Sequence, residues 1–288
     1  MGEALALASA LCFGATHFLN GLLARRADSA AVALTGQLGG TALMLALAPL
    51  AAAPHITPAA LGWGALSGLG TGLGVAFLYR GMSGGRFSVV VPLSDVAAVA
   101  LPVLIGVALL GDRPTWPAWT GIAAAPPALW LISRSARADA SPGAAAPRGR
   151  GVVASGACDG LVAGVGFAAQ FVALAQADAA AGLWPLAVSR AVSVLALVPP
   201  VARRPRAPRM PGRLAWACAG VGALGTVAIT LYVLAAREQL MSLAVVLTAL
   251  YPAIPVLLGV TVLRERLTRA QAAGLACAGA AIALISLA

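Results

Sequence analysis

The sequence contains no lysine, and charged residues of both signs make up only 10% of its 288 positions. A soluble domain usually carries roughly 25% charged residues. Hydrophobic residues make up 60% of this chain, and its mean hydropathy is +0.92. The scarcity of charge predicts an integral membrane protein. The nineteen basic residues are all arginines, nearly all in short loops, and this pattern follows the positive-inside rule rather than nucleic-acid binding.

Metal-ligating and redox residues are equally scarce. The chain has two histidines, His17 and His55, and four cysteines that lie singly in apolar segments without a Cys-x-x-Cys pair. The glycine-rich run 68–74 is not a phosphate-binding loop, because no Lys-Ser or Lys-Thr follows it and it lies inside an apolar segment. We therefore expect no cofactor, no metal site, no ATP-driven step and no enzymatic activity.

Long apolar segments dominate the rest of the chain. Ten of them are long enough to cross a bilayer, which takes about 20 residues. The arginine-containing stretch 134–150 separates the fifth from the sixth and is predicted to be a flexible basic linker. The expected fold is therefore all-α, with ten transmembrane helices in residues 4–24, 30–50, 58–79, 87–110, 117–133, 151–176, 182–201, 212–235, 241–263 and 270–287.

The chain contains an internal repeat. Residues 58–123 and 211–276 resemble each other at a constant separation of 153 positions. Because each half, 1–133 and 151–288, holds an odd number of expected helices, the second half inserts upside down relative to the first. The sequence thus predicts two inverted five-helix repeats. Matched pairs include Pro58 with Pro211, Trp63 with Trp216, Tyr79 with Tyr232, Pro102 with Pro255, and Asp112 with Glu265.

The arginines are distributed unequally between the two sets of loops. Sixteen of the nineteen lie in the loops that follow the first, third, fifth, seventh and ninth expected helices. The opposite loops hold only Arg113 and Arg237. The positive-inside rule places the arginine-rich loops in the cytoplasm, and so both termini outside an inner or plasma membrane.

The ends of the fourth and ninth expected helices carry a doubled motif, which resembles the signature of the EamA family of the drug/metabolite transporter superfamily. The chain departs from the family pattern at Asp112, where glutamate is usual, and at Arg264, where glycine is usual. The motif residues are Asp112, Arg113 and Gly121 in the first half, and Glu265, Arg266, Gln271 and Gly274 in the second.

The resemblance implies a ten-helix carrier of small metabolites or drugs. It implies a central cavity that opens to one side of the membrane at a time, and no prosthetic group. It also implies that both termini lie in the cytoplasm, which conflicts with the arginine distribution. We expect the arginine distribution to decide the orientation of this chain.

Three ionisable residues lie at membrane depth: Asp95, Asp159 and Arg190. Burial of such a group costs about 2.5–3.5 kcal/mol on insertion scales, so each is a candidate functional residue. Either carboxylate could bind a substrate amine or a coupling proton, because desolvation favours the protonated acid. Arg190 could bind a substrate carboxylate. The alternative is an internal Asp159–Arg190 pair that only joins helices.

Neutral polar residues surround these three in the sequence. His17 and Asn20 share a face of the first helix, and a lone membrane histidine is either a proton relay or a hydrogen-bonded structural residue. Tyr79 and Tyr232 lie at helix ends and are expected in the interfacial belt. The remaining substrate- or proton-binding candidates are Gln37, which is the repeat partner of Arg190, Gln170, Thr248, which aligns with Asp95, and Tyr251.

Glycine and proline mark candidate packing and hinge positions. Gly64, Gly68 and Gly72 form a stripe of small residues, which favours close helix packing and could also form a sliding surface. Pro102 and Pro255 are repeat partners and are expected to kink the fourth and ninth helices. They are hinge candidates, although a bend without a hinge is equally consistent with the sequence.

These observations favour a secondary active transporter that exports a small organic metabolite or drug by alternating access. The expected partners are the solute, the bilayer and, as a candidate driving force, protons. A monomer and a homodimer are both compatible with the sequence. The alternatives are a non-transporting receptor or structural membrane protein, and a lipid-handling membrane enzyme, but the loops are short and carry no catalytic cluster.

Overall fold

The computed structural model describes residues 1–24, 26–83, 87–135, 150–202, 210–262 and 268–286. Residues 136–149 of the expected linker, and the motif residues Glu265 and Arg266, lie outside the described residues. Over the described ranges the chain is helical and forms no β-strand, which confirms the all-α expectation.

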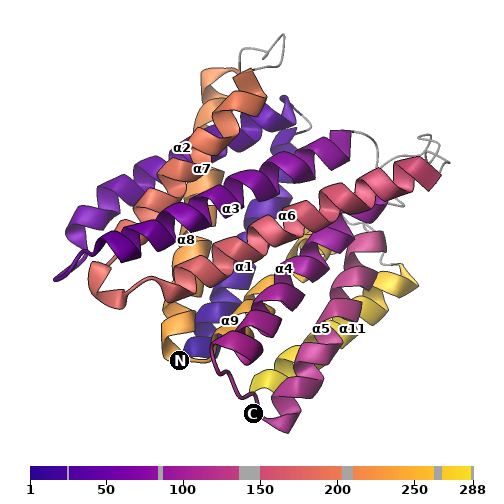
Figure 1. Cartoon of the computed structure of the whole chain (residues 1–288). Helices are drawn as coiled ribbons and strands as arrows, with labels where there is room; N and C mark the ends of the chain where they lie inside the picture. Colours follow the sequence, from indigo (N-terminus) through magenta and orange to yellow (C-terminus); the bar gives the residue numbers. More distant parts are fainter. Residues whose placement is uncertain (25, 84–86, 136–149, 203–209, 263–267, 287–288) are drawn as a thin grey trace.

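The helices follow the apolar segments closely (Figure 1). Asp28 caps the second helix by accepting hydrogen bonds from the backbone N–H groups of Ala30 and Ala31, at 3.0 and 3.1 Å. The helices are α1 (Gly2–Ala24), α2 (Ser29–Leu47), η1 (Ala48–Leu50), α3 (Pro58–Ser83), α4 (Phe87–Leu109), α5 (Trp116–Ser135), α6 (Arg150–Gln176), η2 (Ala179–Ala181), α7 (Trp184–Ala202), α8 (Gly212–Glu238), α9 (Met241–Ala249), α10 (Ala253–Val262) and α11 (Arg269–Ser286).

Six described segments are long and apolar enough to cross a membrane: Gly2–Ala24, Ala30–Leu50, Pro58–Leu78, Ala157–Gln176, Gly212–Glu238 and Met241–Val262. Three shorter apolar helices accompany them: Leu93–Leu109, Trp184–Pro199 and Arg269–Ile285. Helix α5, which contains Pro126 and Pro127, belongs to neither group. The count of ten spanning helices therefore stays a prediction.

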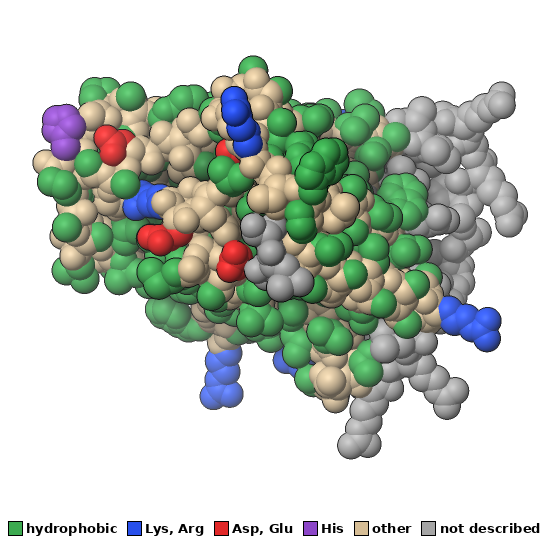
Figure 2. All heavy atoms as spheres, turned by 90° about the horizontal axis from the view of Figure 1, so that it is seen from below, with side chains coloured by type: hydrophobic (Ala, Val, Ile, Leu, Met, Phe, Trp, Pro, Cys, Tyr) green, Lys and Arg blue, Asp and Glu red, His purple; other side chains and the backbone are tan. Residues whose placement is uncertain are grey.

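The outer surface of the bundle is apolar, unlike that of a soluble protein. Large apolar side chains point outward, such as Leu109 at 77% and Trp216 at 81% exposure. In Figure 2, hydrophobic side chains cover most of the visible face and charged side chains are few. Polar side chains such as Ser67, Ser189 and Ser193 are instead fully buried. This arrangement is suited to a lipid environment with polar groups inside the bundle.

Glycines let neighbouring helices touch backbone to backbone. The stripe Gly64, Gly68 and Gly72 lies against α7, where an added Cβ at each position would collide with α7 atoms. Gly222 of α8 is packed so closely on α2 that an added Cβ would collide with the backbone of Gly36. Close approach of this kind is the usual way in which membrane helices associate.

Matching contacts fix the relative directions of the helices. Helix α3 runs antiparallel to α6, because Gly70 packs near Gly166 whereas Gly81, further along, packs near Asp159. The same helix runs parallel to α7. Helices α5 and α11 lie side by side (Figure 1), and they are antiparallel, since the start of α5 contacts the end of α11.

The two ends of the bundle differ in charge and in packing. One end holds the exposed side chains of Arg26, Arg80, Arg213 and Arg269, and we call it the arginine end. Outside α5 and α11, the hydrophobic core is concentrated toward the opposite end. Apart from Val256 of α10, its members come from the beginnings of α1 and α7, the ends of α2, α6 and α8, the second half of α4, and the segment of α9 up to Leu250.

Candidate functional site

The ninth expected span is interrupted near its middle. Helix α9 ends at Ala249 and α10 begins at Ala253. Between them the Tyr251 N–H donates to the Thr248 carbonyl at 3.3 Å, and Pro252 has no N–H to continue an α-helix. Helix α1 packs directly on this break, because a Cβ at Gly14 would lie 2.8 Å from the Tyr251 carbonyl oxygen.

Three of the sequence candidates meet at this break. The Tyr251 hydroxyl donates a hydrogen bond to Oδ1 of Asp95 on α4, at 3.1 Å. The His17 ring of α1 stacks on the Tyr251 ring, with the ring centroids 4.5 Å apart and the planes 20° apart. Asp95 is buried, whereas His17 is exposed on the arginine-end half of α1. A carboxylate from α4, an imidazole from α1 and a phenol from the break between α9 and α10 therefore form one cluster.

An aromatic row continues from this cluster toward the opposite end. Phe13 contacts Tyr251 and Phe171, with ring centroids 6.0 and 6.5 Å away. Phe171 in turn packs edge-on against Tyr232 at 4.7 Å. Tyr232 is fully buried and its hydroxyl donates to the Phe171 carbonyl at 2.9 Å, so its expected place in the interfacial belt is wrong. The ring is part of the core, because α8 extends beyond it by more than one turn.

Arg190 and Gln37 contact each other between α7 and α2. Nη1 of Arg190 donates to Oε1 of Gln37 at 3.2 Å. The Ser193 hydroxyl donates at 2.8 Å to the Arg190 carbonyl and lies 3.4 Å from the same amide oxygen. Arg190 is only 7% exposed, and its Nε has no hydrogen-bond partner within the described part of the chain.

Asp159 is not paired with Arg190. Its Oδ1 instead accepts hydrogen bonds from Nε and Nη2 of Arg80, at 2.9 and 2.5 Å. The guanidinium of Arg80 also lies over the Phe77 ring, 4.1 Å from its centroid. Because the Arg80 side chain is 59% exposed, this ion pair lies at the arginine end of the bundle. The alternative of an internal Asp159–Arg190 pair is therefore wrong.

The remaining polar candidates are spread over other helix contacts. Oε1 of Gln170 accepts a hydrogen bond from the Thr71 hydroxyl, which joins α6 to α3. The fully buried Thr248 hydroxyl donates to the Ala6 carbonyl at 3.4 Å. Asn20 follows His17 on α1 and is partly exposed. The structure thus brings His17, Tyr251 and Asp95 together in one cluster and pairs Arg190 with Gln37, while Asp159, Gln170 and Thr248 bond to other residues.

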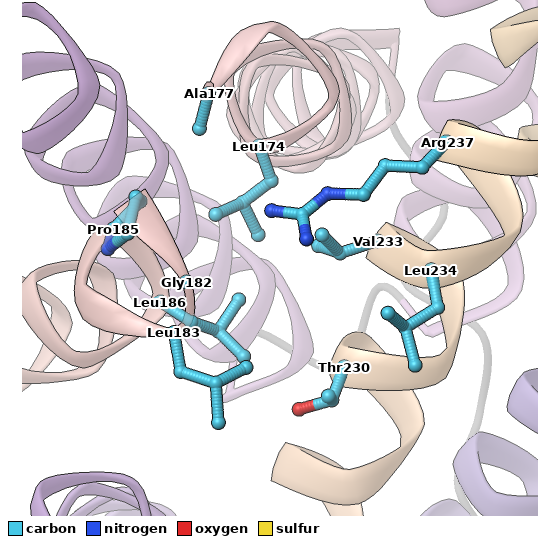
Figure 3. Close-up of a pocket in the computed structure, with 10 residues that line it drawn as sticks. All are labelled: Leu174, Ala177, Gly182, Leu183, Pro185, Leu186, Thr230, Val233, Leu234 and Arg237. Carbon is cyan, nitrogen blue, oxygen red and sulfur yellow. The ribbon is translucent and has the colours of Figure 1, made fainter. Parts of the chain in front are cut away.

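A small pocket lies elsewhere, where α6, α7 and α8 meet near the opposite end (Figure 3). Its empty volume is about 300 Å³, part of which is open to the outside. The lining is largely apolar, with Thr230 and the Arg237 side chain as its polar members. Among the described residues, no group of three or more His, Cys, Asp or Glu side chains could hold a metal ion.

Comparison with known proteins identifies the family. The sequence profile described as the EamA-like transporter family matches residues 1–134 and 154–287. The chain belongs to the EamA-like transporter family. The membership confirms the resemblance to the drug/metabolite transporter superfamily and makes the chain a multi-pass membrane transporter of this type.

A solved structure supports the fold of this EamA-like protein. One protein crystal structure matches with a TM-score of 0.72 at 18% identity, over 99% of this chain and 96% of its own. At that identity the likeness shows the shared fold alone. No curated protein sequence matches the chain.

The described EamA motif residues form helix caps and packing contacts. Asp112 lies before α5, and its Oδ2 accepts the Ser242 N–H at the start of α9 at 2.9 Å. Gln271 and Thr268 form a capping box at the start of α11, with reciprocal bonds of 2.9 and 3.2 Å. Gly121 and Gly274 lie in the tight contact between α5 and α11. The exposed Arg113 follows Asp112 in the chain.

Sequence reasoning missed several partners of the candidate residues. The charge of Arg80 predicts a loop position, yet the residue lies in the last turn of α3 and binds Asp159. Phe13 and Phe171 look like ordinary lipid-facing residues in a hydrophobic sequence. Neither of the prolines expected to kink a helix marks the break. The helix is broken at residues 250–252, before Pro255, and α4 runs through Pro102 without interruption. Only Pro252, which has no counterpart in α4, could have indicated the break.

Proposed function

We propose that this EamA-like protein is a secondary transporter that exports a small organic solute by alternating access, with Asp95 as its proton-binding residue. The observation that carries the proposal is the Tyr251–Asp95 hydrogen bond. It joins α4 of the first half to the broken helix of the second half, within the apolar segment of each. Interrupted helices and membrane-buried carboxylates are typical of substrate and ion sites in transporters.

Two contacts support the arrangement of the halves as inverted repeats. Gln37 and Arg190 are 153 positions apart, which is the repeat separation, and they are hydrogen-bonded. Cys277 Sγ donates at 3.3 Å to the carbonyl of Ala124, again its partner at 153 positions. A residue can touch its own repeat partner only near a two-fold axis. These pairs therefore support a pseudo-two-fold axis that passes between α2 and α7 and between α5 and α11.

The asymmetry of the bundle supports one of the two states that alternating access requires. The core seals the opposite end, where the aromatic row from Phe13 to Tyr232 is buried. His17 is exposed on the arginine-end side of the break, next to Tyr251. In this state solute and protons reach Asp95 from the arginine end. The positive-inside rule makes that end cytoplasmic.

Protonation of Asp95 gives the cycle a switch. The ionised carboxylate accepts the Tyr251 hydroxyl and holds α4 against the break. A protonated Asp95 carries no charge, so its hydrogen bond with Tyr251 is weaker than the charge-assisted one. The break between α9 and α10 then moves more freely relative to α4, which we expect to open the opposite end.

The test is solute flux in proteoliposomes with an imposed pH gradient. A panel of small organic solutes is first screened for thermal stabilisation of the purified protein, and stabilising solutes are then assayed for transport. We expect Asp95→Asn to abolish the response to the pH gradient. Asp159→Asn is the matched acid-to-amide control and should keep that response, because Asp159 lies in the Arg80 ion pair. Wild-type flux that ignores the pH gradient would contradict the proposal.

The orientation has its own test. A C-terminal alkaline phosphatase fusion should be active, and a C-terminal green fluorescent protein fusion should not fluoresce, because the arginine distribution places both termini outside. The reverse result would assign the arginine end to the outside and would invert the direction of access to Asp95.

A further inference from the structure

We propose that Arg190 binds a carboxylate group of the transported solute, so that the substrate class is the small organic monocarboxylate. The inference rests on the proposed transport function and adds the chemistry that the site recognises. It starts from a buried guanidinium whose charge no acidic side chain in the described part of the chain balances.

Burial without a counter-charge is costly for an arginine. Arg190 is 7% exposed and lies near the middle of α7. The ion pair found among the described residues uses Asp159 and Arg80, and Asp95 bonds to Tyr251. The partner of Arg190 is a neutral amide. A cation retained in this position at such a cost is expected to have a negatively charged ligand during part of the working cycle.

The free edge of the guanidinium has the shape that a carboxylate needs. Nη1 is occupied by Gln37. Nε is buried without a partner, and Nη2 makes no hydrogen bond to the described part of the chain either. These two N–H groups are parallel donors on one edge, which bind the two oxygens of a carboxylate together.

The charge count favours a carboxylate over a phosphate. One guanidinium balances a single negative charge, whereas a phosphate monoester carries about −1.5 to −2 at neutral pH. The neighbouring polar groups are hydroxyls and an amide, such as Ser193 and Gln37, and these add no positive charge. A phosphate at this position would keep an uncompensated negative charge inside the bundle.

The position of Arg190 fits a solute site that both halves share. Gln37 is its repeat partner, so the pair lies on the pseudo-two-fold axis. Asp95 of α4 and Tyr251 of the break between α9 and α10 also link the two halves. Sites in inverted-repeat transporters lie near the midplane at the repeat interface. The internal repeat places Gln37 and Arg190 at equivalent positions on the axis. Because the second half carries arginine where the first half carries glutamine, this position is positively charged.

The experiment compares matched acids and amides as ligands of the purified full-length protein. The probes are acetate and acetamide, benzoate and benzamide, and phenylacetate and phenylacetamide, at equal ionic strength. We expect at least one acid to stabilise the wild-type protein more than its amide. Arg190→Gln should weaken binding of that acid by about 10- to 100-fold and leave binding of the amide unchanged.

A swapped variant separates recognition from folding. Gln37→Arg combined with Arg190→Gln returns the cation to the same axis, and we expect it to regain part of the acid preference. Arg190→Lys, which keeps the charge but loses the parallel donors, should bind the acid less tightly than the wild type. If Arg190→Gln fails to fold, the swapped and lysine variants still give the comparison.

Three results would overturn the inference: amides that stabilise the wild type as well as acids, a persistent acid preference in Arg190→Gln, or no response to any acid. The failure of the transport proposal looks different. In that case acids bind the wild type through Arg190, but no flux is found in proteoliposomes. Conversely, the protein could transport a neutral or cationic solute, and Arg190→Gln could leave that flux unchanged. This result contradicts the carboxylate inference but not the transport proposal.

Discussion

At the scale of single residues, the Tyr251 hydroxyl has a role that its ring does not share. The ring stacks on His17 and contacts Phe13, whereas the hydroxyl bonds only to Asp95 among the described residues. Tyr251→Phe therefore removes one hydrogen bond to the carboxylate and keeps the aromatic packing. This separates the electrostatic contribution of the residue from its contribution to the fold.

We expect Tyr251→Phe to fold but to lose much of the response of its flux to the pH gradient, because the ionised Asp95 can then no longer hold α4 against the break through this hydrogen bond. The measurement is the pH profile of initial flux, with Tyr232→Phe as the control, since that hydroxyl bonds to the Phe171 carbonyl instead. An unchanged pH response in Tyr251→Phe, or an equal loss in both variants, would contradict the assignment of Tyr251.

The residues of the site show how far sequence reasoning reaches at this scale. Depth in an apolar segment correctly singled out Asp95, Asp159 and Arg190 as buried side chains. It could not tell that Asp159 binds Arg80, because that pair depends on how far α3 and α6 extend at one end of the bundle. Contacts between helices are set by packing, and the hydropathy of each helix alone does not encode them.

At the scale of secondary-structure elements, the EamA motif residue Asp112 connects two helices. It follows α4 in the chain, yet it accepts the Ser242 N–H in the first turn of α9. The first N–H groups of a helix have no partner inside the helix, so a carboxylate there acts as a cap. Asp112 thereby joins the two proposed halves at the opposite end.

Asp112→Ala should lower the free energy of unfolding by about 1 kcal/mol, the usual effect of losing a helix cap. Asp112→Asn should lose less, because its amide oxygen still accepts the hydrogen bond. The measurement is unfolding in mixed micelles, with Arg113→Ala as the exposed neighbouring control, for which we expect a change within about 0.5 kcal/mol. Equal stability of the two alanine variants would show that the cap is unimportant.

Glycines on both helices form the close contact between α2 and α8, and those of α8 differ in how much space surrounds them. Gly222 faces Gly36 without room for a Cβ, whereas Gly220 on the same helix has open space around it. We expect Gly222→Leu to abolish folding or correct assembly, while Gly220→Leu is tolerated. Monodispersity in gel filtration and thermal stability compare the two variants. Similar behaviour of both would mean that α2 and α8 can separate without loss.

Element boundaries were largely readable from the sequence, because apolar length sets where a helix can lie in a membrane. The main difference is the division of the ninth segment into α9 and α10. Pro255 was the expected kink, but the chain leaves the helix at residues 250–252, where Pro252 also lacks an N–H. The first half has no proline at the matching position, and there α4 is continuous.

At the scale of the whole molecule, the unequal ends make the structure one state of a proposed two-state cycle. The core cluster fills the opposite end, and the polar cluster around Asp95 lies between that core and the arginine end. In an inverted repeat, the second state is obtained when the two halves exchange their conformations. The repeat partners α4 and α9–α10 already have different conformations, since α4 is continuous and its partner is broken. An exchange would break α4 and make α9–α10 continuous.

Accessibility along α1 tests this state directly. On a background without the native cysteines, we expect His17→Cys to react with a membrane-impermeant maleimide added at the arginine end, because the side chain is exposed there. Ser9→Cys lies two turns earlier on the same helix, is fully buried against Ala228, and should remain unlabelled. A stabilising solute should slow labelling of His17→Cys if it occupies the space beside Tyr251. Labelling from the opposite end alone would mean that the state is open in the other direction, and would reverse the direction of access to Asp95.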